Sequence, residues 1–273
     1  MPESALKLAA GLYQPAMGVV SLTGPDAADF LNRLSTLDFK KWDASRTRLG
    51  AFLTGRSGVV ALGYFQSAPD GFHYIVPQHV LATALEHIEK FHFAERMQIQ
   101  DVSKQWDVAA LVGGAGQWAD AWLPEVQWSK VPAGSRAPSP VQDERLLEFA
   151  WIEKGAPRVG VDIDSTVMIL EAGLERAVDR GKGCYPGQEV VERIFTYGQV
   201  NRKLFPVRIT GDWKGQSLPM KFSHGDRVGA TLVGALSNPQ GGADAGLAFV
   251  TRALWETAEP FVQDGIKIDV RHS

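Results

Sequence analysis

The sequence predicts an α+β protein with largely antiparallel sheets, followed by a small all-β unit. Helical and strand-like patterns alternate up to about residue 200 of the 273. Turn segments such as 54–58 and 67–71 join neighbouring strands there, which favours hairpins over parallel crossovers. Further on, the chain carries only short strand patterns separated by Gly, Pro, Asn and Asp. We therefore predict an N-terminal region over residues 1–200 and a C-terminal β-barrel domain over residues 201–273.

The N-terminal elements follow from residue patterns. Residues 19–24 are rich in β-branched side chains and end at glycine, which indicates a strand. Residues 24–36 have helical spacing, and Pro25 suits the first position of that helix. Residues 48–77 predict three strands separated by turns. Residues 77–93 repeat apolar side chains at helical spacing, which predicts an amphipathic helix.

The middle of the chain continues this alternation. Residues 97–103 and 106–113 predict two more strands, and the Pro- and Ser-rich stretch 129–142 predicts a loop or internal linker. Residues 143–155 predict a helix, and residues 167–181 are expected to be helical at least in their second half. The strands predicted for the C-terminal domain are 203–211, 226–237, 245–250 and 266–271.

Composition excludes several classes of function. The net charge of −3 gives no basic footprint, so we do not expect nucleic acid as a direct partner. A single cysteine excludes an internal disulfide and a zinc site built on paired cysteines, and no histidine pair has ligand spacing, so we predict no metal site. No apolar run is long enough to cross a bilayer, and the first residues lack a secretory signal. We therefore predict a cytoplasmic protein with no membrane association.

The single cysteine lies in an unusual setting, the stretch RGKGCYPGQEVVERIF. Gly183 and Gly187 flank Cys184 and allow backbone conformations that other residues avoid, while Pro186 stiffens the turn between them. The residues from Gly187 onward predict a helix. Cys184 therefore precedes a helix N-terminus, where the unpaired N–H groups carry partial positive charge. Lys182 adds a full positive charge two residues away.

Positive charge near a thiol favours the thiolate. We therefore expect Cys184 to be the reactive residue, with Lys182 as its electrostatic partner. The alternative is a buried structural cysteine, because free cysteine is among the most buried residue types. The lysine, the glycines and the proline favour a surface turn instead, or one that faces a ligand.

The segment Lys182–Glu189, KGCYPGQE, resembles the K-G-C-Y-x-G-Q-E signature of the YgfZ-type folate-binding proteins. These proteins belong to the GcvT, or aminomethyltransferase, superfamily and are related to mitochondrial iron–sulfur assembly proteins. Residues 170–178 and the stretches 22–39, 51–65 and 224–237 resemble other parts of the family. The family pattern R-x-x-x-x-G-x-x-x-R-x-L continues the signature, and it is matched here by Arg193, Gly198, Arg202 and Leu204.

The resemblance implies a tripartite GcvT-like fold, in which two α+β lobes and a C-terminal β-barrel surround a central cavity that holds tetrahydrofolate. It implies a folate-binding accessory protein for the assembly or repair of iron–sulfur enzymes, including tRNA-modifying ones, with folate and these client enzymes as partners. The candidate folate-binding residues are Glu171, Tyr185, Gln188, Glu189 and Arg193. Gly183, Pro186 and Gly187 are expected to shape the turn of the signature.

Several alternatives stay open. An active aminomethyltransferase has the same fold but carries aspartates in a G-G-I-x-D-D pattern, where this chain has Ala61 and Leu62. Apolar side chains cannot stabilise a developing positive charge, so classical turnover is not expected. Glu171 and Glu189 can equally be ordinary acids on a helix. The basic residues near Arg202 also allow a tRNA-interaction module.

Overall fold

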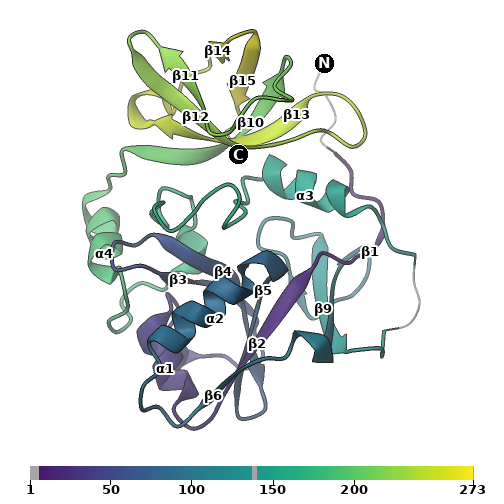
Figure 1. The fold of residues 1–273 in the computed structure, drawn as a ribbon, viewed down its shortest axis with the longest axis vertical. Helices are drawn as coiled ribbons and strands as arrows, with labels where there is room; N and C mark the ends of the chain where they lie inside the picture. Colours follow the sequence, from purple (N-terminus) through teal and green to yellow (C-terminus); the bar gives the residue numbers. More distant parts are fainter. Residues whose placement is uncertain (1–5, 137–139, 273) are drawn as a thin grey trace.

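The computed structural model describes residues 6–136 and 140–272, which form three antiparallel sheets and four α-helices (Figure 1). In the view of Figure 1, a barrel-like sheet lies above two lobes. No helix among these residues is long and apolar enough to cross a membrane. Residues 137–139 belong to the predicted linker 129–142, so that part of the prediction falls outside the described residues.

The first lobe is built on a five-stranded sheet with strand order β3-β4-β5-β2-β6. Helices α1 (Ala27–Leu34) and α2 (Leu81–Lys90) pack on this sheet through their apolar faces, as their spacing predicts. Its strands are β2 (Met17–Thr23), β3 (Arg48–Leu53), β4 (Val59–Ala68), β5 (Gly71–Pro77) and β6 (Gln98–Asp101).

The second lobe has a four-stranded sheet with strand order β1-β7-β9-β8. Its strands are β1 (Gly11–Tyr13), β7 (Trp106–Val112), β8 (Trp118–Ala119) and β9 (Val126–Pro132). The chain therefore crosses from the second lobe into the first after β1 and returns at β7. Helix α3 (Glu144–Glu153) lies between this lobe and the barrel, where it contacts β10, β12 and β13 (Figure 1).

The C-terminal unit is a six-stranded sheet with strand order β11-β12-β13-β10-β15-β14. The sheet curls until its edge strands β11 and β14 touch, so it forms a nearly closed barrel around a core of its own. This confirms the predicted α+β class with antiparallel sheets and a C-terminal barrel. Its strands are β10 (Arg202–Thr210), β11 (Met220–His224), β12 (Arg227–Leu236), β13 (Asp244–Thr251), β14 (Phe261–Gln263) and β15 (Ile266–Val270).

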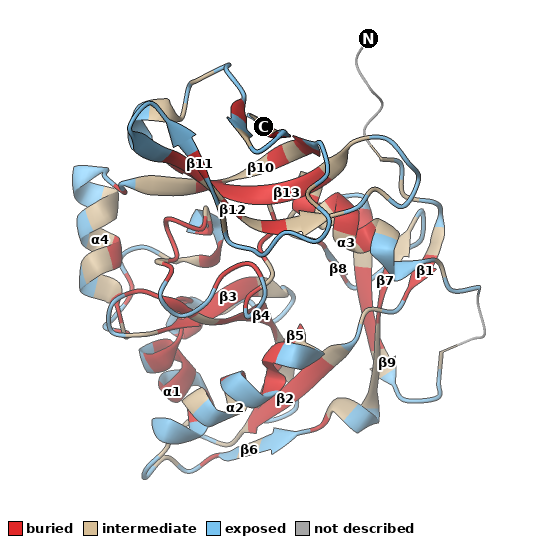
Figure 2. Ribbon diagram, turned by 45° about the horizontal axis from the view of Figure 1, so that its top comes forward, coloured by how far each residue is buried: buried red, intermediate tan, exposed pale blue. Residues whose placement is uncertain are grey.

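Helix α4 (Gln188–Tyr197) joins the two parts of the chain and lies at the edge of the molecule. Figure 2 shows it mostly exposed or intermediate, and Val191 is its one buried residue. Short 3₁₀ helices occupy other connections, namely η1 (Phe39–Lys41), η2 (Gln78–Val80), η3 (Ser103–Gln105), η4 (Glu175–Ala177) and η5 (Arg252–Leu254).

Three sequence predictions of elements were wrong. The predicted linker begins inside β9, which pairs with β7 and buries Trp128 and Lys130 despite the polar residues around them. The predicted helix in 167–181 is a series of turns with only the three-residue η4, because its backbone bonds to other elements: Ile169 N–H donates to Ser57 O at 2.9 Å. Pro25 precedes the N-cap Asp26 and is not the first helical residue.

Candidate functional site

A cavity of about 250 Å³ opens between the two lobes. The first lobe contributes residues of β3, β4 and β5, the second lobe contributes β9 and the turn before it, and α3 closes one side. Its lining residues are Pro15, Ala16, Met17, Leu49, Leu62, Gly63, Tyr64, Ile75, Pro77, His79, Asp120, Trp122, Trp128, Glu144, Glu148, Trp151, Ala156, Pro157, Arg158 and Val159.

Aromatic rings dominate one wall of the cavity. Trp128 from β9 stacks on Trp151 from α3, with ring centroids 5.9 Å apart and planes 12° from parallel. Tyr64 from β4 lies beside Trp128, with ring centroids 6.2 Å apart and planes 52° from parallel. Such faces bind flat conjugated rings by offset stacking and burial. Trp122 extends the aromatic lining.

A buried carboxylate, Asp120, fixes this wall. Its Oδ2 accepts hydrogen bonds from the Trp128 indole N–H at 2.9 Å and from the Tyr64 hydroxyl at 3.3 Å. Its Oδ1 accepts from the backbone N–H groups of Trp122 and Leu123, at 2.8 and 2.9 Å. Burial and the Asp120 charge together raise the pKa of Tyr64, so its hydroxyl keeps its proton. With four donors, Asp120 is a structural anchor and not a free acid.

Helix α3 contributes two carboxylates to the lining of the cavity. Glu144, Glu148 and Trp151 are spaced i, i+4 and i+7, so they share one helical stripe, and all three line the cavity. Burial, with the neighbouring charges of Glu148 and Asp143, raises the pKa of Glu144. No ion pair holds either Glu144 or Glu148 within the part of the chain that the structure describes. They are therefore available to a ligand that donates hydrogen bonds.

The single arginine of the lining, Arg158, is already ion-paired. Its guanidinium donates to both oxygens of Asp162, at 2.9 and 2.7 Å, and the Asp162 side chain is fully buried. Asp162 in turn lies against Gly234 of β12, where a Cβ would come within 2.1 Å of its Oδ1. The barrel thus holds Asp162, and Asp162 holds Arg158 at the cavity.

Position 62 of the lining is apolar. Leu62 faces the cavity from β4, and Ala61 beside it is fully buried. The wall therefore has no carboxylate where an aminomethyltransferase is expected to carry one. The two apolar residues noted in the sequence, Ala61 and Leu62, therefore belong to the strand that borders the cavity, β4.

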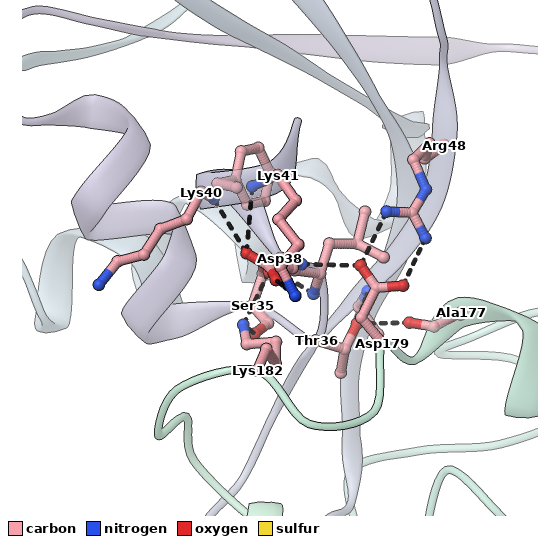
Figure 3. A network of polar contacts seen from close by, with 12 residues as sticks. Ser35, Thr36, Asp38, Lys40, Lys41, Arg48, Ala177, Asp179 and Lys182 are labelled. Atoms are coloured by element: carbon pink, nitrogen blue, oxygen red, sulfur yellow. Dashed lines mark hydrogen bonds and ion pairs between the residues drawn. The ribbon is translucent and has the colours of Figure 1, made fainter. Parts of the chain in front are cut away.

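The signature loop lies elsewhere, between the η1 region and α4. Cys184 is exposed there, as its setting predicts. Lys182 is buried, and its ammonium donates to the carbonyl oxygens of Asn32, Ser35 and Leu37 at 2.7, 2.6 and 2.7 Å (Figure 3). Lysine has three donors, and all three are used. The predicted pairing of Lys182 with the Cys184 sulfur is therefore not made by a hydrogen bond; the lysine secures the loop instead.

The electrostatics of Lys182 reflect this burial. Removal from water lowers its pKa to about 8, while Asp38 and Asp179 act in the opposite direction. The ring of Tyr185 lies 4.7 Å from the ammonium, a distance typical of a cation–π contact. Tyr185 is itself buried, its hydroxyl has no partner among the described residues, and burial raises its pKa.

A second anchor precedes the loop. Both oxygens of Asp179 accept from the Arg48 guanidinium, at 2.7 and 2.6 Å, and Asp179 Oδ2 also accepts from the Asp38 N–H at 2.8 Å (Figure 3). The Thr36 hydroxyl donates to Ala177 O at 2.6 Å. This network fastens residues 177–182 to the first lobe, so the loop has a fixed position beside α1 and β3.

The two glycines of the signature differ. Gly187 has φ +81° and is the N-cap of α4, and a Cβ there would meet Ser57 N and Thr54 O at 2.7 Å, so the predicted need for glycine is met. Gly183 is not in the left-handed region, and the nearest atom to an added Cβ is 3.7 Å away. Gly183 therefore does not use the backbone freedom that glycine allows.

The remaining predicted residues are spread over three places. Gln188 starts α4, after the partly buried Pro186, and its amide donates to Lys182 O at 3.3 Å; Glu189 is exposed in the first turn, where an acid suits the helix. Arg193 borders a separate hollow with Tyr197 and Asn201. Glu171 is buried and accepts from the Arg202 guanidinium at 3.2 Å.

None of the site residues predicted from the sequence lies among the lining residues of the cavity. The sequence does place Glu144, Glu148 and Trp151 on one face of a predicted helix, and Leu62 and Tyr64 on one face of a predicted strand. That shared periodicity of acids and aromatics is the signal for the cavity. What the sequence cannot supply is the fact that these two faces meet.

The fold is GcvT-like. The solved structure of glycine cleavage system aminomethyltransferase T from Bartonella henselae matches with a TM-score of 0.75, covering 97% of this chain and 86% of that one. The two sequences are only 14% identical, so this similarity establishes the fold alone. Residues 5–124 match the family described as the GCVT N-terminal domain.

Two further relatives are distant. A chloroplastic protein of Arabidopsis thaliana that bears the name of a transferase is 21% identical over 281 residues. That alignment covers 86% of this chain, which spans 63% of the relative's length. An uncharacterized protein of Haemophilus influenzae is 22% identical over 231 residues, covering 80% of this chain and 81% of that one.

Proposed function

We propose that this protein binds tetrahydrofolate in the cavity between its lobes and serves as an accessory protein to iron–sulfur enzymes. The observation that carries the folate proposal is the pairing of an aromatic wall with unpaired glutamates in one cavity. The GcvT-like fold supports it, and the signature that resembles YgfZ-type proteins supports the link to iron–sulfur clients. Among the described residues, no group of acids, histidines and cysteine could hold a metal ion.

The lining fits the chemistry of a reduced pterin. The pterin ring is flat and apolar on its faces, which suits Trp128, Trp151 and Tyr64. Its edge carries several N–H donors, which a carboxylate accepts in pairs. Glu148 is the lining acid nearest in sequence to Trp151 on the helical stripe, and Glu144 supplies a second carboxylate toward the surface. We assign the pterin edge to Glu148, replacing the sequence prediction of Glu171.

The same cavity argues against the chemistry of an aminomethyltransferase. That reaction passes through a positively charged one-carbon unit on the folate, which a nearby carboxylate stabilises. Leu62, at the position where that carboxylate is expected, supplies no charge. We therefore propose that folate binding occurs without classical turnover. An assay with an aminomethylated lipoyl carrier checks this, and product formation at rates of about 1 s⁻¹ or more would contradict it.

The exposed thiol gives the protein a second functional surface. Cys184 is open to solvent on a loop that three carbonyl contacts hold in place, and it is not part of the cavity lining. An exposed, fixed thiol suits contact with another macromolecule, such as an iron–sulfur client enzyme. The Cys184→Ser variant should then keep its affinity for tetrahydrofolate and lose the support of client activity in cells. Unchanged client activity would show that the thiol has no such role.

Calorimetric titration with tetrahydrofolate tests the central proposal. Binding should be detectable in the wild type and weaker by about tenfold or more in Glu148→Gln, because a hydrogen bond to a charged group is lost. Glu171→Gln is the matched control, since Glu171 pairs with Arg202 outside the lining. Absence of heat in the wild type would reject folate binding, and equal weakening in both variants would reject the assignment to Glu148.

A further inference from the structure

The cavity is small for a whole folate molecule. Its volume of about 250 Å³ lies below the roughly 300–1,000 Å³ of pockets that enclose drug-sized ligands. A folate consists of a pterin, a p-aminobenzoyl group and a glutamyl tail with two carboxylates. The aromatic wall accounts for the pterin. The anionic tail must then lie outside the cavity, and the charges around the rim decide where it lies.

The α3 side of the rim repels carboxylates. Glu144 is exposed there, Glu148 lies one turn further along, and neither has an ion-pair partner in the described parts of the chain. Arg158 offsets them only in part, because Asp162 binds its guanidinium, although the charge of Glu148 also acts on it. Like charges at short range destabilise a bound anion. The tail is therefore expected on another side of the cavity.

A free cation marks that other side. Arg176, in η4, is exposed, and its guanidinium carbon lies 5.4 Å from the ring centroid of Trp122, a cavity residue. It donates one hydrogen bond, to the carbonyl oxygen of Ala121. Nearby cations are paired: Arg180 with Glu192 at 3.8 Å and Lys203 with Glu175 at 3.1 Å. Within residues 6–136 and 140–272, Arg176 has no carboxylate partner.

We infer that Arg176 binds the glutamyl carboxylates of the folate, which leave the cavity past Trp122. This inference rests on the folate binding proposed above and extends it to the recognition of the tail. A guanidinium has five N–H donors, so four remain after the bond to Ala121. Stacking on Trp122 limits the motion of the guanidinium, so less entropy is lost when it pairs with a carboxylate.

Paired ligands separate the tail from the ring. Calorimetry with tetrahydrofolate and with 6-methyltetrahydropterin, which has the ring but no tail, is carried out on the wild type, Arg176→Gln and Arg180→Gln. Arg176→Gln should weaken tetrahydrofolate binding about fivefold at low salt and leave 6-methyltetrahydropterin unchanged. The difference should shrink at high salt. Arg180→Gln, which removes an already paired arginine, should change neither ligand.

Each result has a distinct meaning. If Arg176→Gln weakens both ligands equally, Arg176 acts by supporting Trp122, and tail recognition is rejected. Unchanged binding of tetrahydrofolate in Arg176→Gln also rejects it. If the wild type binds neither ligand, the folate proposal itself fails.

Discussion

At the scale of single residues, Gly187 and Lys182 fix the position of the exposed thiol in different ways. Gly187 lets the chain turn tightly against the hairpin turn at Thr54 and Ser57, directly before α4. Lys182 connects the loop to α1 and to the turn after it, because its ammonium donates to the carbonyl oxygens of Asn32, Ser35 and Leu37. Both residues thus hold the backbone of the loop that carries Cys184.

Replacing Gly187 by alanine should destabilise the protein strongly. The new Cβ would overlap backbone atoms of Ser57 and Thr54, and the backbone has φ +81°, a conformation unfavourable for alanine. We expect the free energy of unfolding in urea to fall by about 2 kcal/mol or more. Gly183→Ala is the matched control and should stay within about 0.5 kcal/mol of the wild type. Equal effects of the two changes would contradict the observed difference between the glycines.

Replacing Lys182 by methionine should also destabilise the fold. The substitution keeps the aliphatic chain but leaves three buried carbonyls without their donor, which costs about 3 kcal/mol. Lys203→Met removes an exposed ion pair with Glu175 and should cost less than about 1 kcal/mol. Urea unfolding of both variants measures the difference. A stable Lys182→Met protein would mean that the loop does not depend on the ammonium.

The residue scale also shows what the sequence could and could not predict. The exposure of Cys184 and the need for glycine at position 187 follow from local patterns, and the structure confirms both. The partners of Lys182 lie roughly 150 residues earlier in the chain. Charge and proximity in sequence therefore pointed to Cys184, while the fold supplied acceptors that no local pattern reveals.

At the scale of elements, the contact between the two lobe sheets includes an unusual buried pair. The Lys130 ammonium, from β9, contacts His73 Nδ1, from β5, and lies 4.2 Å from the Trp106 ring. Burial and the charge of Lys130 lower the pKa of His73 to about 4, and burial lowers the pKa of Lys130 to about 8. Charging His73 would place two positive groups side by side between the sheets.

Stability should therefore fall in mild acid. The unfolded chain binds a proton at His73 near pH 6.5, but the folded protein binds it only near pH 4. Because the unfolded state gains the proton first, stability decreases as the pH falls through this window, by about 2–3 kcal/mol in all. His73→Asn should flatten this part of a urea-unfolding profile. His224→Asn, at an exposed position, should not, and the same slope in both variants would contradict the role of His73.

Elements with strong periodicity were predictable and the others were not. Helices α2 and α3 and the strands of the first lobe match the patterns of the sequence, because their apolar faces pack on the sheets. Residues 167–181 carry helix-forming side chains, but their backbone bonds to the turn before β4 and to Leu204. Tertiary hydrogen bonds override propensity there.

At the scale of the whole molecule, the barrel reaches the cavity through a chain of contacts. Gly234 of β12 leaves room for Asp162, Asp162 binds Arg158, and Arg158 lines the cavity. The tripartite arrangement was predictable only through resemblance to a known family, since composition and periodicity define the parts and not their placement. The cavity residues come from segments between 15 and 159, which no single motif covers.

Gly234→Ala should therefore affect both stability and ligand binding. The added Cβ would displace the Asp162 carboxylate and free Arg158, costing about 1–3 kcal/mol in the free energy of unfolding. Tetrahydrofolate affinity should fall as well, measured by calorimetry under conditions where the variant is folded. Gly55→Ala, whose added carbon meets nothing within 4 Å, is the control. Full affinity in Gly234→Ala would show that the barrel does not influence the cavity.

The placement of β1 in the sheet of the second lobe has a consequence for synthesis on the ribosome. Residues 11–13 emerge early, yet their partner strand, residues 106–112, appears only after the whole five-stranded sheet has been made. The first lobe can thus complete its pairing while the leading segment is still unattached. Attachment of that segment then joins the two lobes, so a strand made before the first lobe pairs only after that lobe has been made.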